Sequence, residues 1–137
     1  GCAKVGIDIA VATPKGYEPD EQIVYLAKQD ALKHGASINI TNNPVEAVKD
    51  ADVVVTDVWA SMGQEAEKAM RVRDFAPYQV NEKLVSHARP DYIFLHCLPA
   101  HRGEEVMEDI IDGPNSVVWD EAENRLHSQK ALLAMLL

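Results

Sequence analysis

The sequence of 137 residues has few basic residues and no long apolar run. It contains 13 Lys and Arg against 22 Asp and Glu, which gives a formal net charge of −9. Nucleic acids and anionic surfaces bind proteins mainly through Lys and Arg, so both are poor partners for this chain. Charged residues interrupt every apolar stretch well short of the ~20 residues that a membrane-spanning helix needs. We therefore expect a soluble chain that binds neither nucleic acid nor membrane.

Cysteine is also scarce. The only two cysteines, Cys2 and Cys97, lie far apart in the sequence and form no disulfide framework. Two cysteines without a disulfide framework are typical of a protein in a reducing compartment, and they predict a cytoplasmic protein. The first residues lack an initiator Met and the basic-then-apolar layout of a signal peptide, so we expect them to follow an internal cut.

Several nucleotide-binding and hydrolase motifs are missing. No Gly-x-Gly-x-x-Gly follows the first predicted strand, and no Gly-Lys-Ser/Thr phosphate loop occurs. A Ser flanked two residues away on both sides by Gly is absent too. These absences disfavour a dinucleotide-binding protein, an ATPase and a serine hydrolase.

Apolar segments of strand length alternate with charged segments that have helical spacing. The predicted strands span residues 6–13, 37–41, 51–57, 91–97 and 116–120. The predicted helices span residues 19–34, 44–50, 64–75, 81–88, 104–111 and 122–137. This alternation predicts an α/β fold with a parallel sheet covered by helices on both faces. The length suits one domain over residues 1–137.

Polar side chains follow several predicted strands, and parallel strands end at the edge where ligands bind. Asp57 closes a Val-rich strand and needs either a cation, such as a substrate ammonium, or a role with Ser61 in capping the next helix. Cys97 is either a small buried hydrophobe or a nucleophile and hydrogen-bonding group. Arg125, near the start of the last predicted helix, either forms a surface ion pair or binds an anion or a carbonyl oxygen.

A zinc site is an alternative for part of this edge. His96, Cys97 and His101 are possible ligands, but a structural zinc site usually has four ligands at recurrent short spacings. No fourth ligand is obvious in the sequence. We therefore expect no metal.

Three motifs carry the most specific information in the sequence. Residues 57–65 read DVWASMGQE, residues 96–106 read HCLPAHRGEEV, and residues 121–125 read EAENR. Together they resemble the ornithine carbamoyltransferase family. Residues 12–19, ATPKGYEP, are similar to the same family, and the likeness runs along the whole chain. Relatives that act on aspartate differ at both Ser-Met-Gly and His-Cys-Leu-Pro, and those that act on putrescine or acetylated ornithine differ around Ser-Met-Gly.

The resemblance implies transfer of a carbamoyl group from carbamoyl phosphate to the δ-amine of L-ornithine, without metal or organic cofactor. It implies that Asp57 binds the α-ammonium, together with Ser61 and the backbone of Met62. Cys97 and the carbonyl of Leu98 would meet the δ-amine. Arg125 would contact carbamoyl phosphate, and His96 would support the loop.

Other family motifs are missing from this chain. Neither Ser-x-Arg-Thr nor His-Pro-x-Gln, which belong to the carbamoyl-phosphate half, occurs, and the Gly-Asp-x-Asn-Asn loop is absent. The resemblance therefore implies the C-terminal, ornithine-binding domain, with a Rossmann-like sheet that lacks its first central strand and with residues 1–4 ending a helix. Its partners would be the carbamoyl-phosphate domain and further copies in a homotrimer. The alternatives are a non-catalytic amino-acid-binding or interaction module and a transcarbamylase for a related amine.

Removal of a central strand leaves interior strand edges unpaired and promotes aggregation. We therefore expect these residues to belong to a longer enzyme chain, or to receive the strand from elsewhere, and the isolated fragment to be inactive. Mass spectrometry of the source material tests this expectation. An intact 15.1 kDa species that refolds alone as a monomer would contradict it.

Overall fold

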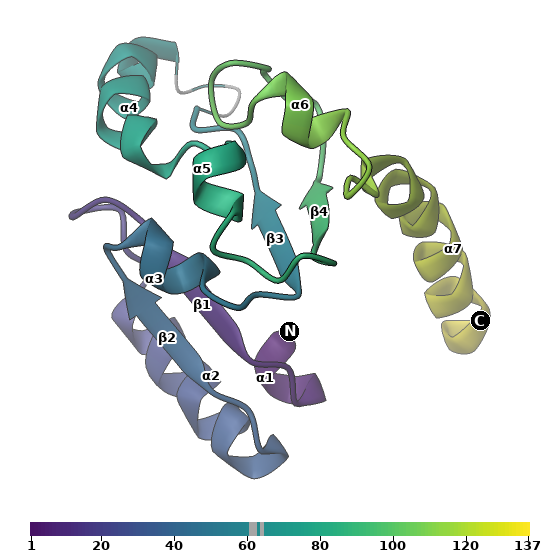
Figure 1. The fold of residues 1–137 in the computed structure, drawn as a ribbon. Helices are drawn as coiled ribbons and strands as arrows, with labels where there is room; N and C mark the ends of the chain where they lie inside the picture. The colour runs from purple at the N-terminus through teal and green to yellow at the C-terminus, as the bar shows by residue number, and fades with distance from the viewer. Residues whose placement is uncertain (61–62, 64) are drawn as a thin grey trace. The chain divides into compact units, whose positions relative to one another are not determined.

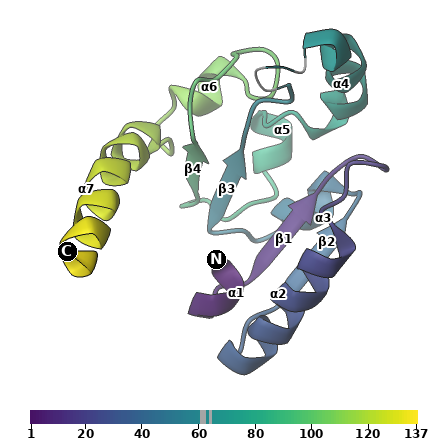
Figure 2. The same ribbon diagram turned by 180° about the vertical axis from the view of Figure 1, so that it is seen from behind.

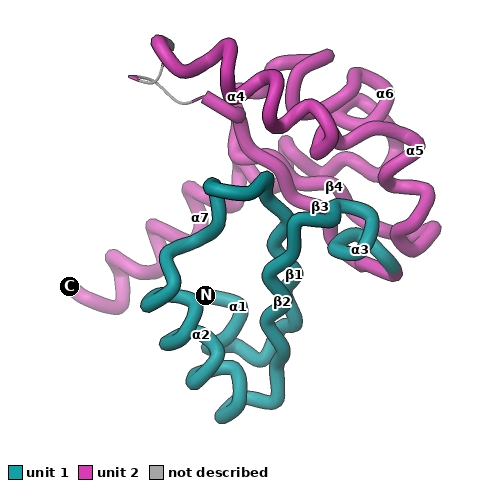
Figure 3. The backbone as a smooth tube through the Cα atoms, turned by 90° about the vertical axis from the view of Figure 1, so that its left-hand side faces the viewer, with its two compact units in different colours: residues 1–49 teal, residues 50–137 magenta. Residues whose placement is uncertain are grey.

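The computed structural model describes residues 1–60, 63 and 65–137 (Figure 1). The chain divides into two compact units, residues 1–49 and 50–137 (Figure 3). Each unit combines helices with one pair of parallel strands. The predicted α/β class with parallel pairing is confirmed, whereas the assignment of residues 1–137 to one functional domain stays a prediction.

The first unit contains β1 (Ile9–Ala12) and β2 (Ile38–Thr41), which pair in parallel. Its helices are α1 (Cys2–Val5), α2 (Glu21–His34) and α3 (Pro44–Val48). The side chain of Asp20 accepts hydrogen bonds from the first backbone N–H groups of α2, and Gly35 ends this helix in the left-handed conformation. The predicted helices 19–34 and 44–50 are therefore confirmed, with slightly shorter bounds.

Gly6 explains why the first strand starts later than predicted. Its φ of 77° ends α1, so the chain becomes extended only at Ile9. A Cβ at Gly6 would lie 2.9 Å from the carbonyl oxygen of His34 at the end of α2. Glycine therefore permits the close approach of α1 to the end of α2.

The second unit contains β3 (Val53–Thr56) and β4 (Ile93–His96), also parallel (Figure 2). Its helical segments are η1 (Glu65–Glu67), α4 (Lys68–Phe75), η2 (Ala76–Tyr78), α5 (Glu82–Val85), α6 (Glu108–Ile111) and α7 (Val118–Leu136). The core of this unit includes the buried side chains of Phe94, Val106, Ile111 and Val118. Beyond Glu121, every residue of α7 is exposed.

The predicted strand at 116–120 is wrong. Ser116 forms only an isolated parallel bridge with Phe94, and the pairing ends after Val117 donates to the Phe94 carbonyl at 3.0 Å. Helix α7 then begins at Val118, with Asp120 and Glu121 in its first turn, where acidic side chains interact favourably with the helix dipole. The β-branched pair at 117–118 suggested a strand that the backbone does not form.

The predicted helix at 104–111 is too long at its start. The Val80 N–H donates to the Glu105 carbonyl and the Met107 N–H donates to the Val80 carbonyl, both at 2.9 Å. Val106, fully buried, forms the bridges of this segment. Because these backbone groups bond to another segment, helix α6 starts only at Glu108.

The described strands form two sheets of two strands each, instead of one continuous sheet. Val53 and Val55 of β3 are 44% and 63% exposed, unusually high values for valines in a strand of a parallel sheet.

No helix among the described residues is long and apolar enough to cross a membrane.

We predict that Ile111→Val lowers the free energy of unfolding by about 1 kcal/mol, since it removes a methylene from a side chain that is only 3% exposed. Urea denaturation measures this loss. The matched control is Ile93→Val, the same change in the same unit at a side chain that is 38% exposed. Equal losses for the two variants would show that the assigned core is wrong.

Candidate functional site

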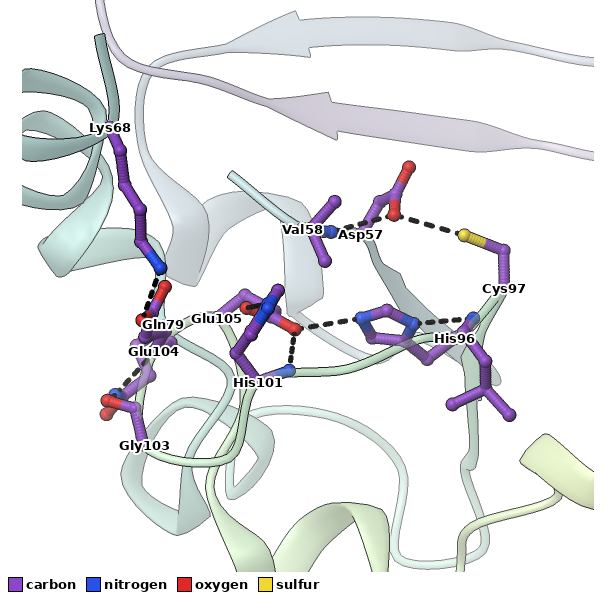
Figure 4. A network of polar contacts seen from close by, with 11 residues as sticks. Asp57, Val58, Lys68, Gln79, His96, Cys97, His101, Gly103, Glu104 and Glu105 are labelled. Atoms are coloured by element: carbon purple, nitrogen blue, oxygen red, sulfur yellow. Dashed lines mark hydrogen bonds and ion pairs between the residues drawn. The ribbon is translucent and has the colours of Figure 1, made fainter. Parts of the chain in front are cut away.

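The register of β3 and β4 brings Asp57 and Cys97 together. Thr56 pairs with His96 as the last residue pair of the two strands, so Asp57 and Cys97 are the next residues on each side. The Cys97 thiol donates a hydrogen bond to Asp57 Oδ1 at 3.1 Å, and the Val58 N–H donates to the same oxygen at 2.7 Å (Figure 4). Both side chains are exposed. Two candidate residues that are 40 positions apart in the sequence therefore form one polar pair.

The carboxylate controls the protonation of the thiol. The pKa of Cys97 is raised, first because the hydrogen bond to Asp57 stabilises the thiol form. Partial burial and the negative charges of Asp57 and Glu121 raise it further. Without a ligand, Cys97 is therefore a thiol that donates a hydrogen bond, instead of an activated thiolate.

His96 is a buried structural anchor beneath this pair. Its Nδ1 accepts a hydrogen bond from the Leu98 N–H at 2.9 Å, which requires a lone pair on Nδ1 and places the ring proton on Nε2. Nε2 then donates to Glu105 Oε1 at 3.1 Å (Figure 4). The backbone N–H of His96 donates to Glu121 Oε2 at 2.9 Å. These contacts fix both the ring and the backbone of the residue that precedes Cys97.

The buried Glu105 is a site residue that the sequence reasoning missed. It is 0% exposed, and its Oε1 accepts hydrogen bonds from His96 and from the His101 N–H at 2.6 Å. Of the described residues, none donates a hydrogen bond to its Oε2, and His101 Nδ1 lies 3.7 Å from that atom. An acidic residue immediately before Val106 was the available signal, but it was interpreted as part of a helix start.

Leu98 has an unusual backbone conformation, with φ of +53°, and a cis peptide bond joins it to Pro99. The left-handed conformation costs an L-residue about 1 kcal/mol or more. The hydrogen bond from the Leu98 N–H to His96 compensates for part of this cost. The carbonyl expected to meet the δ-amine therefore belongs to a residue with a fixed conformation.

Arg125 lies on α7, exposed to solvent. Because α7 begins at Val118, Arg125 lies about two turns inside the helix, and its predicted position near the helix start is wrong. Glu121, one turn earlier on the same face of the helix, bonds to the backbone of His96. This contact anchors that face of α7 to the end of β4. The predicted site residues Ser61 and Met62 lie outside the described residues.

The proposed zinc ligands do not form one group among the described residues. The donor atoms of Asp57, His96 and Cys97 lie within 4.8 Å of one another, and His101 belongs instead to a second group with Glu104 and Glu105. In the first group, both ring nitrogens of His96 already form hydrogen bonds. His96 could bind a metal only if one of these bonds broke. The geometry therefore favours a hydrogen-bonded pair of Asp57 and Cys97 over a metal site that includes His96.

The fold and this site define a class of protein: an α/β domain that presents a carboxylate and a thiol, suited to an amine ligand, where two adjacent parallel strands end. Residues 1–136 match the family model described as aspartate/ornithine carbamoyltransferase, Asp/Orn binding domain. The chain belongs to this family.

Individual relatives of the chain support this assignment. The chain is 66% identical to the ornithine carbamoyltransferase of Pyrococcus abyssi over 134 residues, which cover 98% of this chain and 42% of the relative. The structure of the Pyrococcus furiosus ornithine carbamoyltransferase matches with a TM-score of 0.91 at 64% identity, covering 96% of this chain and 42% of that one. For the anabolic enzyme of Campylobacter jejuni the TM-score is 0.93 at 44% identity, with 98% and 45% covered. The chain thus spans less than half the length of these relatives.

We predict that Glu105→Ala lowers the free energy of unfolding by about 3 kcal/mol, because it leaves the buried ring N–H of His96 and the partly buried backbone N–H of His101 without their acceptor. Its neighbour Glu104 provides the matched control. Glu104 forms a partly exposed ion pair with Lys68 at 2.9 Å, so Glu104→Ala should cost less than about 1 kcal/mol. Urea denaturation of both variants measures the difference. If both losses are small, the His96–Glu105 contact does not stabilise the site.

Proposed function

We propose that residues 1–137 form the ornithine-binding domain of an ornithine carbamoyltransferase. The reaction transfers the carbamoyl group of carbamoyl phosphate to the δ-amine of L-ornithine and releases L-citrulline and phosphate. The observation that supports this proposal most directly is the contact between Asp57 and Cys97 at the ends of β3 and β4. It offers one group for each amine of the same substrate.

Asp57 is proposed to bind the α-ammonium of ornithine. Its carboxylate is exposed, and a primary ammonium supplies up to three charged donors to it. The family resemblance adds Ser61 and the backbone of Met62 to the same end of the substrate. The backbone bond from Val58 to Oδ1 holds the carboxylate in place for this contact.

Cys97 and the Leu98 carbonyl are proposed to receive the δ-amine. With a lysine-like pKa of ~10.4, this amine is mostly protonated near pH ~8, and exposing its lone pair there costs roughly 3 kcal/mol. The sulfur of Cys97 and the carbonyl oxygen of Leu98 orient the nitrogen, and the sulfur, as a thiolate, accepts its proton. The amine then attacks the carbamoyl carbon, a tetrahedral oxyanion forms, and the bond to phosphate breaks. Arg125 is proposed to contact carbamoyl phosphate and to stabilise the developing negative charge.

The hydrogen bonds of His96 hold the backbone beside Cys97 in place for this chemistry. Glu105 fixes the imidazole, and the imidazole fixes the backbone of Leu98. Glu121 fixes the backbone of His96 itself. We assign all three as positioning residues, because each acts on the loop that carries Cys97.

The complete reaction needs more than this chain. Because the chain spans 42% of the Pyrococcus relatives, we infer that a carbamoyl-phosphate domain in the rest of a longer enzyme completes the site. We further infer a homo-oligomer, a trimer by family resemblance, in the cytoplasm. The charge of −9 gives no support to nucleic acid as a partner.

A chimera tests the activity: the P. furiosus enzyme with this chain in place of its matching part. We predict that it forms citrulline from L-ornithine and carbamoyl phosphate, and that Cys97→Ala lowers kcat about tenfold or more through loss of a proton-transfer group. The matched control is Cys2→Ala, which should leave kcat unchanged. If the folded chimera binds ornithine without turnover, the chain is an amino-acid-binding module instead. Unchanged turnover of Cys97→Ala at every pH would remove Cys97 from the mechanism.

In the same chimera, Asp57→Asn should raise the KM for L-ornithine by roughly tenfold to a hundredfold, since a hydrogen bond to a charged group contributes about 1.5–3 kcal/mol. Steady-state kinetics measure the change. Asp52→Asn is the matched control: it makes the same change at a side chain that is 81% exposed and forms an ion pair with Arg89 at the surface. A KM unchanged by Asp57→Asn would show that the α-ammonium binds elsewhere.

A further inference from the structure

We propose that the Asp57–Cys97 hydrogen bond couples the two ends of the substrate, so that an ammonium group bound by Asp57 releases the Cys97 thiol to act on the second amine. This inference rests on the proposed function and extends it. Asp57 is then more than an anchor, because it holds Cys97 in an inactive form until the amino-acid end of the substrate is in place.

The two contacts compete at one oxygen of Asp57. From the described residues, Asp57 Oδ1 accepts two hydrogen bonds, from the Val58 N–H at 2.7 Å and from the thiol at 3.1 Å, which use both of its lone pairs. The backbone donor is fixed by the chain, whereas the thiol is a weak donor on a rotatable side chain. An ammonium that binds this oxygen brings a full positive charge, so it displaces the neutral thiol in preference to the backbone group.

The charged groups that face Cys97 determine the direction of the effect. From β3 it faces Asp57, and from α7 it is influenced by Glu121; the adjacent His96 directs its ring toward Glu105. Glu121 already accepts a hydrogen bond from the His96 backbone N–H at 2.9 Å. Neutralisation of the Asp57 charge by an ammonium is therefore the change that lowers the pKa of the thiol.

The proton transfers balance in this scheme. When the α-ammonium binds, the thiol releases its proton to solvent and becomes a thiolate. The thiolate then takes a proton from the δ-ammonium, which gives a thiol and a neutral amine. The amine attacks the carbamoyl carbon, the carbon–oxygen bond to phosphate breaks, and the nitrogen loses its second proton to the departing phosphate. A simple amine without an α-ammonium would not trigger the first step, which favours a diamino acid over a monoamine.

The test measures the thiolate in the chimera by its ultraviolet absorbance, as the difference from a Cys97→Ser variant, across a pH titration with a metal chelator present. The probes are L-norvaline, which has the α-ammonium but no δ-amine, and valerate, which has the same carbon chain and carboxylate but no ammonium group. L-Norvaline should lower the Cys97 pKa by about one unit, which gives about tenfold more thiolate at a pH below the pKa. Valerate should leave the Cys97 pKa unchanged.

Two variants separate the coupling from a general charge effect. Asp57→Asn should lower the Cys97 pKa without ligand and abolish the response to L-norvaline. Glu121→Gln should also lower the ligand-free pKa but keep the response.

The coupling is overturned if L-norvaline saturates the chimera, as measured by calorimetry, and the Cys97 pKa does not move. It is also overturned if L-norvaline does not bind, or if Asp57→Asn leaves the ligand-free pKa unchanged. The proposed function fails by a different result: no citrulline formed by the folded, unmodified chimera. A chimera that forms citrulline without any pKa response would keep the function and remove the coupling.

Discussion

The parallel pairing of β3 with β4 is the interaction on which the site depends. Val54 and Phe94 face each other in the register and are both buried, so packing of the core fixes the alignment of the strands. A slip by one residue would turn the buried side chains to the opposite face of the sheet. It would also move Cys97 away from the position opposite Asp57. The same hydrophobic contacts that stabilise the second unit therefore determine the geometry of its polar pair.

Negative charge around the end of β4 serves two separate purposes. Glu105 and Glu121 accept hydrogen bonds from backbone N–H groups and from the His96 ring, and so hold the loop in place. Asp57, in contrast, is exposed and available to a cation. The net charge of −9 suits an ammonium ligand, whereas an anionic second substrate needs local positive charge. Arg125 on α7 is the proposed source of that charge within this chain.

The sequence predicted the four strands found among the described residues, but not where the strands and helices begin and end. Runs of Val and of aromatic and aliphatic residues identified β3 and β4. Because ligands bind where parallel strands end, Asp57 and Cys97 became candidate site residues. The predicted fifth strand was wrong because the β-branched residues at 117–118 lead into a helix. The pairing with β4 is limited to one bridge to Phe94, and the acidic residues that follow stabilise the first turn of α7. Local pattern does not contain this information.

The supporting carboxylates were missed for a related reason. Glu121 bonds to His96 across 25 positions of the sequence, and Glu105 bonds to the same residue across 9 positions. Neither sequence separation is one at which residues of the same helix or strand lie side by side. Only the folded backbone shows that these two acids meet His96. The family resemblance named residues that are expected to contact substrate, whereas the geometry shows which side chains fix the backbone of the loop that carries Cys97.

A crystal structure of the chimera with L-norvaline tests most directly whether the β3–β4 register builds an amine site from Asp57 and Cys97. The account predicts the α-ammonium at hydrogen-bond distance, about 3 Å, from Asp57 Oδ1, with the Cys97 sulfur no longer bonded to that oxygen. An ammonium bound elsewhere, with the contact between Asp57 and Cys97 intact, would contradict it.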